Sequence, residues 1–210
     1  HLDESVALRT LKRIEADHER WRVRPDELRD RFAKQSPRVV AEARRLADRL
    51  DDGNASRGER INRLLAQLAA EPGDIRRGRD VFNSSQAACV GCHAMGYVGG
   101  KVGPDLTRIG SIRSERDLLE AILDPSASFV RGYEPILVEL DDGRTLSGII
   151  KDESQDSLIL RLSATEEERV PRTRIEAVHP GQVSLMPSGL EDQITERALL
   201  DLIAFLKASR

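Results

Sequence analysis

Two cysteines and one histidine stand together in the run Cys89-Val90-Gly91-Cys92-His93, and these are the only cysteines among 210 residues. Such a C-x-x-C-H run supplies two thiols about one helical turn apart and an imidazole directly after them. The thiols can form thioethers with the two vinyl groups of a porphyrin. His93 can then bind the iron from the proximal side. The run therefore predicts covalent attachment of one haem c.

Three other readings of this run are weaker. A redox-active C-x-x-C pair is expected beside a βαβ pattern, which the flanking residues do not show. A structural zinc site needs four ligands, and the remaining histidines (His1, His18 and His179) are scattered. A disulfide between cysteines this close would close a very small loop and stabilise little.

The flanking segments carry a family pattern, which lies in DIRRGRDVF (74–82), GPDL (103–106) and ERALLDLIAFLK (196–207). On these motifs the chain resembles a class I c-type cytochrome. With KVGPDLTRIGS (101–111) and LLEAILDPSA (118–127), it is similar to the haem-binding domain of planctomycete and verrucomicrobial proteins. The resemblance covers about residues 74–132 and 182–210.

The resemblance implies roles for residues near the motif. Pro104 is expected to offer its backbone carbonyl to the second ring nitrogen of His93, which would fix the imidazole tautomer and tune the iron. Leu106 would pack on the haem face. Two helices would cross close together, with Gly78 and Phe82 on one and Leu202 and Phe205 on the other.

The sixth iron ligand has few candidates, because the chain has only two methionines. Met95 follows His93 too closely for the chain to pass around a flat porphyrin. Met186 lies in a loop, SLMPSG (184–189), that resembles the methionine–proline loop of these cytochromes. The pattern favours Met186 as the distal ligand, and His179 ranks second.

Residues 133–180 have a different character, with short alternating runs and an Asp142-Gly143 turn signal. They predict about five antiparallel strands, a small sheet or barrel similar to Sm-like or SH3-like folds. Without this block of 48 residues, His93 and Met186 are 45 positions apart, which suits a small cytochrome. The insert either shields the haem and presents Met186 or docks a redox partner. Its glutamate run, 166–168, argues against nucleic-acid binding.

The N-terminal residues 1–73 predict helices. Ser36-Pro37 is a typical helix start, and one apolar stripe is expected to end near Gly53 and a second near Pro72. These helices could be the end of an α-solenoid or pack on the cytochrome, with Trp21 as a packing anchor. In the cytochrome part, Ser114 and Asp117 predict a capping box, and the last helix is expected to begin near Thr195.

The predicted fold class is therefore mainly α: a cytochrome c helical fold at 74–132 plus 181–210, a helical N-terminal extension and the β insert.

One third of the residues are charged, the net charge is −3, and no sequence segment suits a membrane span. The absence of an initial methionine suggests a fragment or a processed product, and haem attachment suggests an extracytoplasmic location. Because aromatic residues make up only 3%, we expect residues 74–132 to fold poorly without haem.

The predicted function is one-electron transfer rather than catalysis, since two axial ligands leave the iron no open position. The resemblance implies a redox protein or a dehydrogenase-like domain as electron donor. Basic residues near the motif are expected to be solvated rather than to steer a partner; they are Lys101, Arg108, Arg113 and Arg116. Two alternatives stay open. One is a haem-based ligand sensor or peroxidase-like enzyme with a labile distal ligand, and the other is a binding module with a structural haem.

Overall fold

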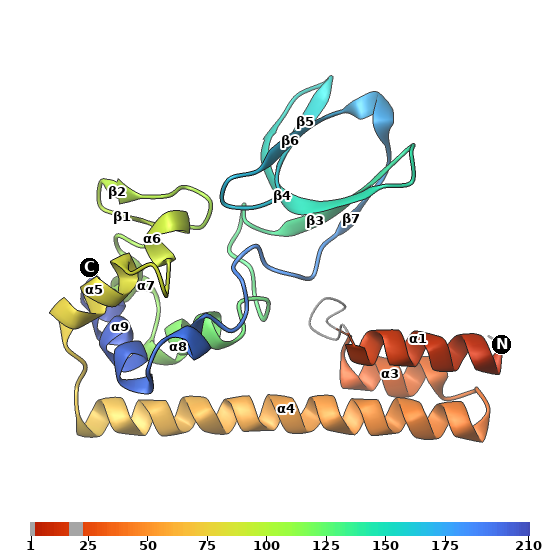
Figure 1. Ribbon diagram of the computed structural model, residues 1–210, viewed down its shortest axis with the longest axis horizontal. Helices are drawn as coiled ribbons and strands as arrows, with labels where there is room; N and C mark the ends of the chain where they lie inside the picture. Colours follow the sequence, from red (N-terminus) through yellow and green to blue (C-terminus); the bar gives the residue numbers. More distant parts are fainter. Residues whose placement is uncertain (1–2, 17–22) are drawn as a thin grey trace. The chain divides into compact units, whose positions relative to one another are not determined.

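A computed structural model describes residues 3–16 and 23–210 (Figure 1). The chain divides into two compact units, His1–Asn62 and Arg63–Arg210. Trp21, His1 and His18 lie outside the described residues, so the predicted anchoring role of Trp21 stays a prediction. The three domain ranges expected from the sequence also stay predictions.

The first unit is built from α1 (Glu4–Ala16), α3 (Pro25–Phe32) and the first part of α4 (Pro37–Ala70). Apolar residues spaced three or four apart give each helix one buried stripe. These stripes form a single core of Ala7, Leu11, Leu28, Phe32, Val39, Ala43, Leu46 and Ala47. The Ser36 hydroxyl accepts a hydrogen bond from the Val39 amide at 3.4 Å, so the predicted Ser36-Pro37 helix start is confirmed.

Helix α4 runs without interruption through Gly53 and Gly58. The prediction of two separate helices, the first ending near Gly53, was therefore wrong. A glycine inside a helix costs only about 1 kcal/mol and keeps its N–H group for the helical hydrogen bonds. Prolines mark both ends of the helix. Pro37 is its first residue, and Pro72 lies just beyond its last residue.

In the second unit, α5 (Ile75–Asn83) and α9 (Glu196–Ala208) cross at very short range. A Cβ atom on Gly78 would lie 1.9 Å from the carbonyl oxygen of Asp201 and 2.8 Å from Cβ of Phe205. The rings of Phe82 and Phe205 have centroids 5.6 Å apart, an ordinary separation for an aromatic pair. The predicted close crossing of these two helices is confirmed.

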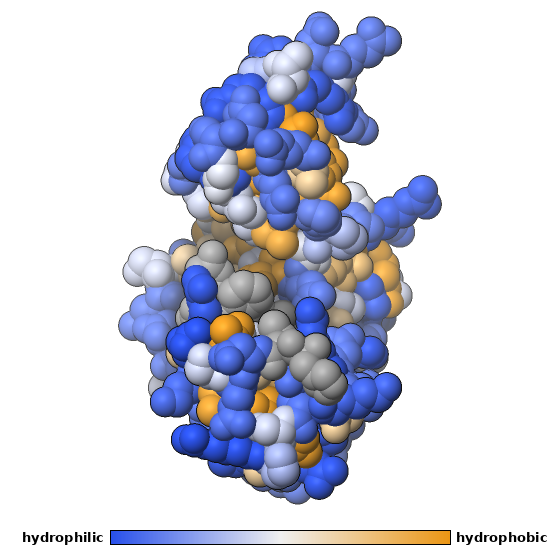
Figure 2. Space-filling view, turned by 90° about the vertical axis from the view of Figure 1, so that its right-hand side faces the viewer, coloured by the Kyte–Doolittle hydropathy of each residue, from blue (hydrophilic) through white to orange (hydrophobic). Residues whose placement is uncertain are grey.

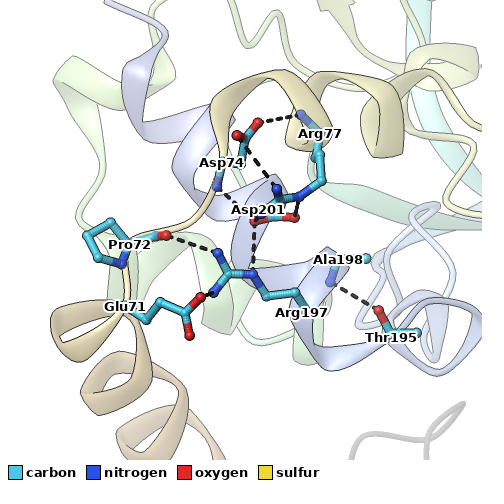
Figure 3. A network of polar contacts seen from close by, with 8 residues as sticks. All are labelled: Glu71, Pro72, Asp74, Arg77, Thr195, Arg197, Ala198 and Asp201. Carbon is cyan, nitrogen blue, oxygen red and sulfur yellow. Dashed lines mark hydrogen bonds and ion pairs between the residues drawn. The ribbon is translucent and has the colours of Figure 1, made fainter.

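The crossing is also held by a buried carboxylate, Asp201, which is 2% exposed (Figure 3). Its oxygens accept hydrogen bonds from the Asp74 amide at 2.7 Å and from Nε and Nη2 of Arg77 at 2.6 and 3.1 Å. Arg197 Nε lies 3.3 Å away. Burial alone would raise the pKa of Asp201, but the Arg77 and Asp74 hydrogen bonds and the two arginine charges outweigh it and lower that pKa.

The remaining helices and the short hairpin of the cytochrome part connect α5 to the sheet. They are α6 (Cys89–Cys92), β1 (Ala94–Met95), β2 (Val98–Gly99), α7 (Ile109–Ile112) and α8 (Glu115–Leu123), with η2 (Leu190–Gln193) before α9. The capping box of Ser114 and Asp117 opens α8, and Thr195 caps α9 by accepting from the Ala198 amide. Both helix starts agree with the sequence predictions.

Residues 135–180 form a five-stranded antiparallel sheet in the order β6-β5-β4-β3-β7. The strands are β3 (Pro135–Leu140), β4 (Thr145–Glu153), β5 (Ser157–Arg161), β6 (Glu167–Pro171) and β7 (Ile175–Pro180), with η1 (Arg172–Arg174) joining the last two. The sheet curls, because Val170 on one edge strand and Ile175 on the other pack into the same core (Figure 1). The five predicted strands are confirmed, and membership of the Sm-like or SH3-like class stays a prediction.

The described residues thus combine helices with a two-stranded and a five-stranded antiparallel sheet. Hydrophilic residues cover most of the face in Figure 2, and hydrophobic residues emerge there in small patches. Within residues 3–16 and 23–210, no helix combines the length and the apolar character that a membrane crossing requires.

Candidate functional site

The two cysteines begin and end the single-turn helix α6. Ala88 enters it in the left-handed conformation, with φ of 50°, and His93 leaves it in an extended one. Both thiols are free. Burial raises the pKa of the Cys89 thiol to about 11. A thiol that stays protonated at neutral pH is a poor redox nucleophile. The burial of Cys89 therefore does not favour a thioredoxin-like role.

His93 is held in one tautomer. Its Nδ1 atom lies 2.8 Å from the backbone carbonyl oxygen of Pro104. Because a carbonyl oxygen only accepts, Nδ1 carries the proton and Nε2 keeps its lone pair. Burial lowers the pKa of His93, although the hydrogen bond to Pro104 opposes that effect. A neutral imidazole with Nε2 available is the form that binds a metal.

The loop 100–104 lies directly against the cysteine turn. The Gly100 amide donates to the Val90 carbonyl at 2.8 Å, and the amides of Val102 and Gly103 donate to the Cys92 carbonyl at 3.0 and 2.8 Å. These three hydrogen bonds place the Pro104 carbonyl beside the histidine ring.

Two glycines allow this loop to pack against the cysteine turn and the His93 ring. A Cβ atom on Gly103 would lie 2.5 Å from Cε1 of His93, and one on Gly100 would lie 2.0 Å from the Gly91 carbonyl oxygen. Real Cβ atoms do not approach this closely, so only glycine fits without a shift of the loop. No role for either glycine was predicted from the sequence. The signal available there was the close spacing of Gly100 and Gly103 just after the C-x-x-C-H run.

The two segments that carry the predicted haem residues keep their apolar side chains only half-buried. No residue in 89–109 or 181–190 is fully buried, whereas α8 and α9 bury most of their apolar side chains. Half-buried apolar residues gather in these two segments: Val90, Met95, Val102, Leu106, Ile109, Val183, Leu185, Met186 and Leu190. Two free thiols, a neutral imidazole and this apolar set match the needs of a covalently held porphyrin.

A structural zinc site lacks such support. Among residues 3–16 and 23–210, no three histidine, cysteine, aspartate or glutamate side chains gather in a way that could hold a metal ion. The protein ligands of a tetrahedral site would have to come from such a group.

Met186 lies in the loop between β7 and η2 and is half-buried. Its amide donates to the Ser184 hydroxyl at 3.1 Å, and the Ser184 amide donates to the Ser126 hydroxyl at 3.0 Å. The loop is therefore fixed to the segment that follows α8. His179, by contrast, belongs to β7, is half exposed and lies 3.5 Å from Glu139 across the sheet.

The other predicted residues have these positions. The Leu106 amide donates to the Ala94 carbonyl at 2.9 Å, which ties the segment after Pro104 to β1. The four basic residues considered for partner steering, Lys101, Arg108, Arg113 and Arg116, are all exposed. The hydrogen bond implied between Pro104 and His93 is present. The roles of Cys89, Cys92, His93, Pro104, Leu106 and Met186 in holding a haem stay predictions.

The glycine-mediated crossing of α5 and α9, with a C-x-x-C-H turn in the same unit, agrees with the class that the sequence resembles, the c-type cytochromes. The chain is 30% identical over 78 residues to a protein described as "Cytochrome c-553-like" from Synechocystis sp. (strain ATCC 27184 / PCC 6803 / Kazusa). The match covers 37% of this chain and 70% of that relative. The chain belongs to the cytochrome c family. No protein-family model matches it.

Proposed function

We propose that this chain is a one-electron carrier that holds a single haem c through thioethers to Cys89 and Cys92, with His93 as the proximal iron ligand. The observation that supports it most directly is the hydrogen bond of 2.8 Å between His93 Nδ1 and Pro104. It leaves Nε2 free one residue beyond two free thiols. When bound, the haem supplies an iron that alternates between two oxidation states.

The cysteines have the form that attachment needs. Each thiol would add across one vinyl group of the porphyrin, with the sulfur bonding to one vinyl carbon and the thiol hydrogen passing to the other. No oxidant or reductant is consumed. In the folded chain, burial raises the pKa of Cys89 and keeps its thiol protonated.

We further propose Met186 as the distal ligand and Leu106 as a side chain that packs on the haem. The fixed loop around Ser184 and its position before α9 support Met186. A thioether ligand raises the potential relative to a second histidine. With two protein ligands, the iron would exchange electrons without binding substrate.

The electron donor is proposed to be a redox protein or a dehydrogenase-like domain, and the location extracytoplasmic. Both proposals come from the resemblance to the planctomycete and verrucomicrobial haem-binding domain and from the family membership.

The proposal is tested by producing the chain in a host that attaches haem c. We expect the denatured polypeptide to keep a haem absorbance that comigrates with it on a denaturing gel. Cys89→Ser and Cys92→Ser should each leave one thioether, seen as a red shift of the alkaline pyridine haemochrome, and the double variant should lose covalent haem. A colourless denatured wild-type chain would refute the proposal.

Met186→Ala tests the distal ligand, and Met95→Ala is a matched control because these are the chain's only methionines. We expect the first variant to lose the methionine–iron charge-transfer band of the ferric protein and to bind carbon monoxide after reduction. The second should keep the band and exclude carbon monoxide. Rapid carbon monoxide binding by the wild-type protein would instead support the sensor or peroxidase-like alternative.

A further inference from the structure

One side chain connects the β insert to the loop beside the cysteine turn. Arg161, the last residue of β5, donates from Nη1 to the carbonyl oxygen of Lys101 at 2.6 Å. The two residues are 60 positions apart, and the Arg161 side chain is only 16% exposed. The contact is therefore a tertiary one, made by a guanidinium that is largely removed from solvent.

The other edge of the guanidinium is held within the sheet. Nε and Nη2 of Arg161 donate to Oε1 of Glu167 at 3.2 and 3.1 Å, and Oε2 of Glu167 accepts from Lys151 at 2.5 Å. Arg161 and Glu167 are direct cross-strand partners of β5 and β6. Because the planar guanidinium is fixed on one edge, its remaining N–H groups point in a set direction.

The carbonyl that Arg161 binds belongs to the loop that fixes the histidine. On one side of Lys101, Gly100 is bonded to the cysteine turn, and on the other side Val102 and Gly103 are bonded to the Cys92 carbonyl. The next residue, Pro104, accepts the hydrogen bond from His93. A constraint on Lys101 is thus three residues from the group that orients the imidazole.

We propose that Arg161 is a positioning residue through which the β insert holds the loop 100–104 on the cysteine turn and keeps the Pro104 carbonyl on Nδ1 of His93. A hydrogen bond at Nδ1 fixes the ring and increases its strength as a ligand. The part of the proposal that concerns the iron depends on the proposed function. The part that concerns the loop does not depend on it.

The first test is amide hydrogen exchange in the full chain with haem attached. Arg161→Gln removes the guanidinium but keeps a polar side chain of moderate length. The probes are the protected amides of Gly100, Val102 and Gly103, and loss of one charge-assisted hydrogen bond should accelerate their exchange about tenfold. Arg174→Gln is the matched control, because Arg174 lies in η1, between two strands of the same sheet, and pairs with Asp141 and Asp142.

The second test uses the haem-loaded protein. Arg161→Gln should shift the midpoint potential of the iron and broaden or move the His93 ring signals in the nuclear magnetic resonance spectrum, whereas Arg174→Gln should change neither. Arg161→Lys keeps a donor for Lys101 but cannot hold Glu167 from two nitrogens, so it should restore the potential in part. A purely structural arginine would not show this graded rescue.

Each outcome decides the proposal. Equal exchange in wild type and Arg161→Gln, or equal acceleration in Arg174→Gln, overturns the loop-holding role. Faster exchange with an unchanged potential overturns the effect on the iron. If Arg161→Gln does not fold, Glu167→Gln replaces it. This variant keeps the arginine but removes the charge from the group that holds its other edge, so it should give a smaller acceleration. Failure of haem attachment would refute the proposed function and, with it, the expectation that residues 74–132 need haem to fold. The exchange comparison would then be made on the haem-free chain.

Discussion

Replacing Gly78 with alanine should strongly destabilise the second unit. The added Cβ atom would lie 1.9 Å from the Asp201 carbonyl oxygen, whereas favourable contacts are about 3.5 Å. Helices α5 and α9 would have to separate by an amount on the order of 1.5 Å. Overpacking of this kind costs about 1–3 kcal/mol. Alanine's better helix propensity returns about 1 kcal/mol.

The separation would also stretch the hydrogen bonds that Asp201 accepts from Arg77 and Asp74, which are 2.6–3.1 Å long. Weakening hydrogen bonds to a buried charged group costs about 1.5–3 kcal/mol. The net loss in the free energy of unfolding is therefore about 1.5–5 kcal/mol. For a unit of this size, each kcal/mol lost from the free energy of unfolding lowers Tm by about 2–4 °C.

Urea unfolding measures the effect of Gly78→Ala, followed by far-ultraviolet circular dichroism and, in the haem-loaded protein, by Soret absorbance. Gly91→Ala is the control in the same unit, because a Cβ atom on Gly91 meets nothing within 4 Å. We expect the control to unfold at the wild-type urea concentration or slightly above it. If Gly78→Ala is as stable as Gly91→Ala, the close helix crossing is not present in solution.

Three further predictions concern other contacts. Asp201→Asn should lower the free energy of unfolding by about 2 kcal/mol at neutral pH. Because the folded pKa of Asp201 is depressed, the wild-type advantage should be present above pH about 4 and be lost as pH falls through that lower pKa; a difference that grows on acidification, in urea titrations from pH 7 to 3, would contradict this. Ser114→Ala removes the cap of α8 and should cost about 1 kcal/mol in the same titration, whereas no loss would mean that the capping box contributes nothing. Gly53→Ala, in the open middle of α4, should stabilise the first unit by about 0.5–1 kcal/mol in calorimetry, and a lower Tm would show that α4 is not helical there.

The sequence predicted those elements that local chemistry specifies. A C-x-x-C-H run needs only its own five residues to indicate haem attachment. Ser36-Pro37, Ser114 and Thr195 mark helix starts because a capping side chain reaches amides two or three residues away. Alternation of apolar and polar residues in 133–180 predicted the five strands, because successive side chains point to opposite faces of a strand.

The sequence-based prediction is wrong where turn-forming residues interrupt a helical pattern. The Asp51-Asp52-Gly53 stretch indicates a helix end, because these residues favour turns. In the structure α4 continues past them. Glycine and aspartate weaken a helix but leave its hydrogen bonds intact, whereas proline removes one.

The residues themselves thus determined the chemistry this chain can offer: two thiols, one imidazole, two methionines and helices long enough to cross. Only the tertiary structure decided how these groups are held. The glycine pair in the loop 100–104 and the Arg161 bond to Lys101, neither of which was predicted, both join atoms from different turns or strands. Such contacts depend on where the backbone comes together in space, and spacing along the chain carries no record of that.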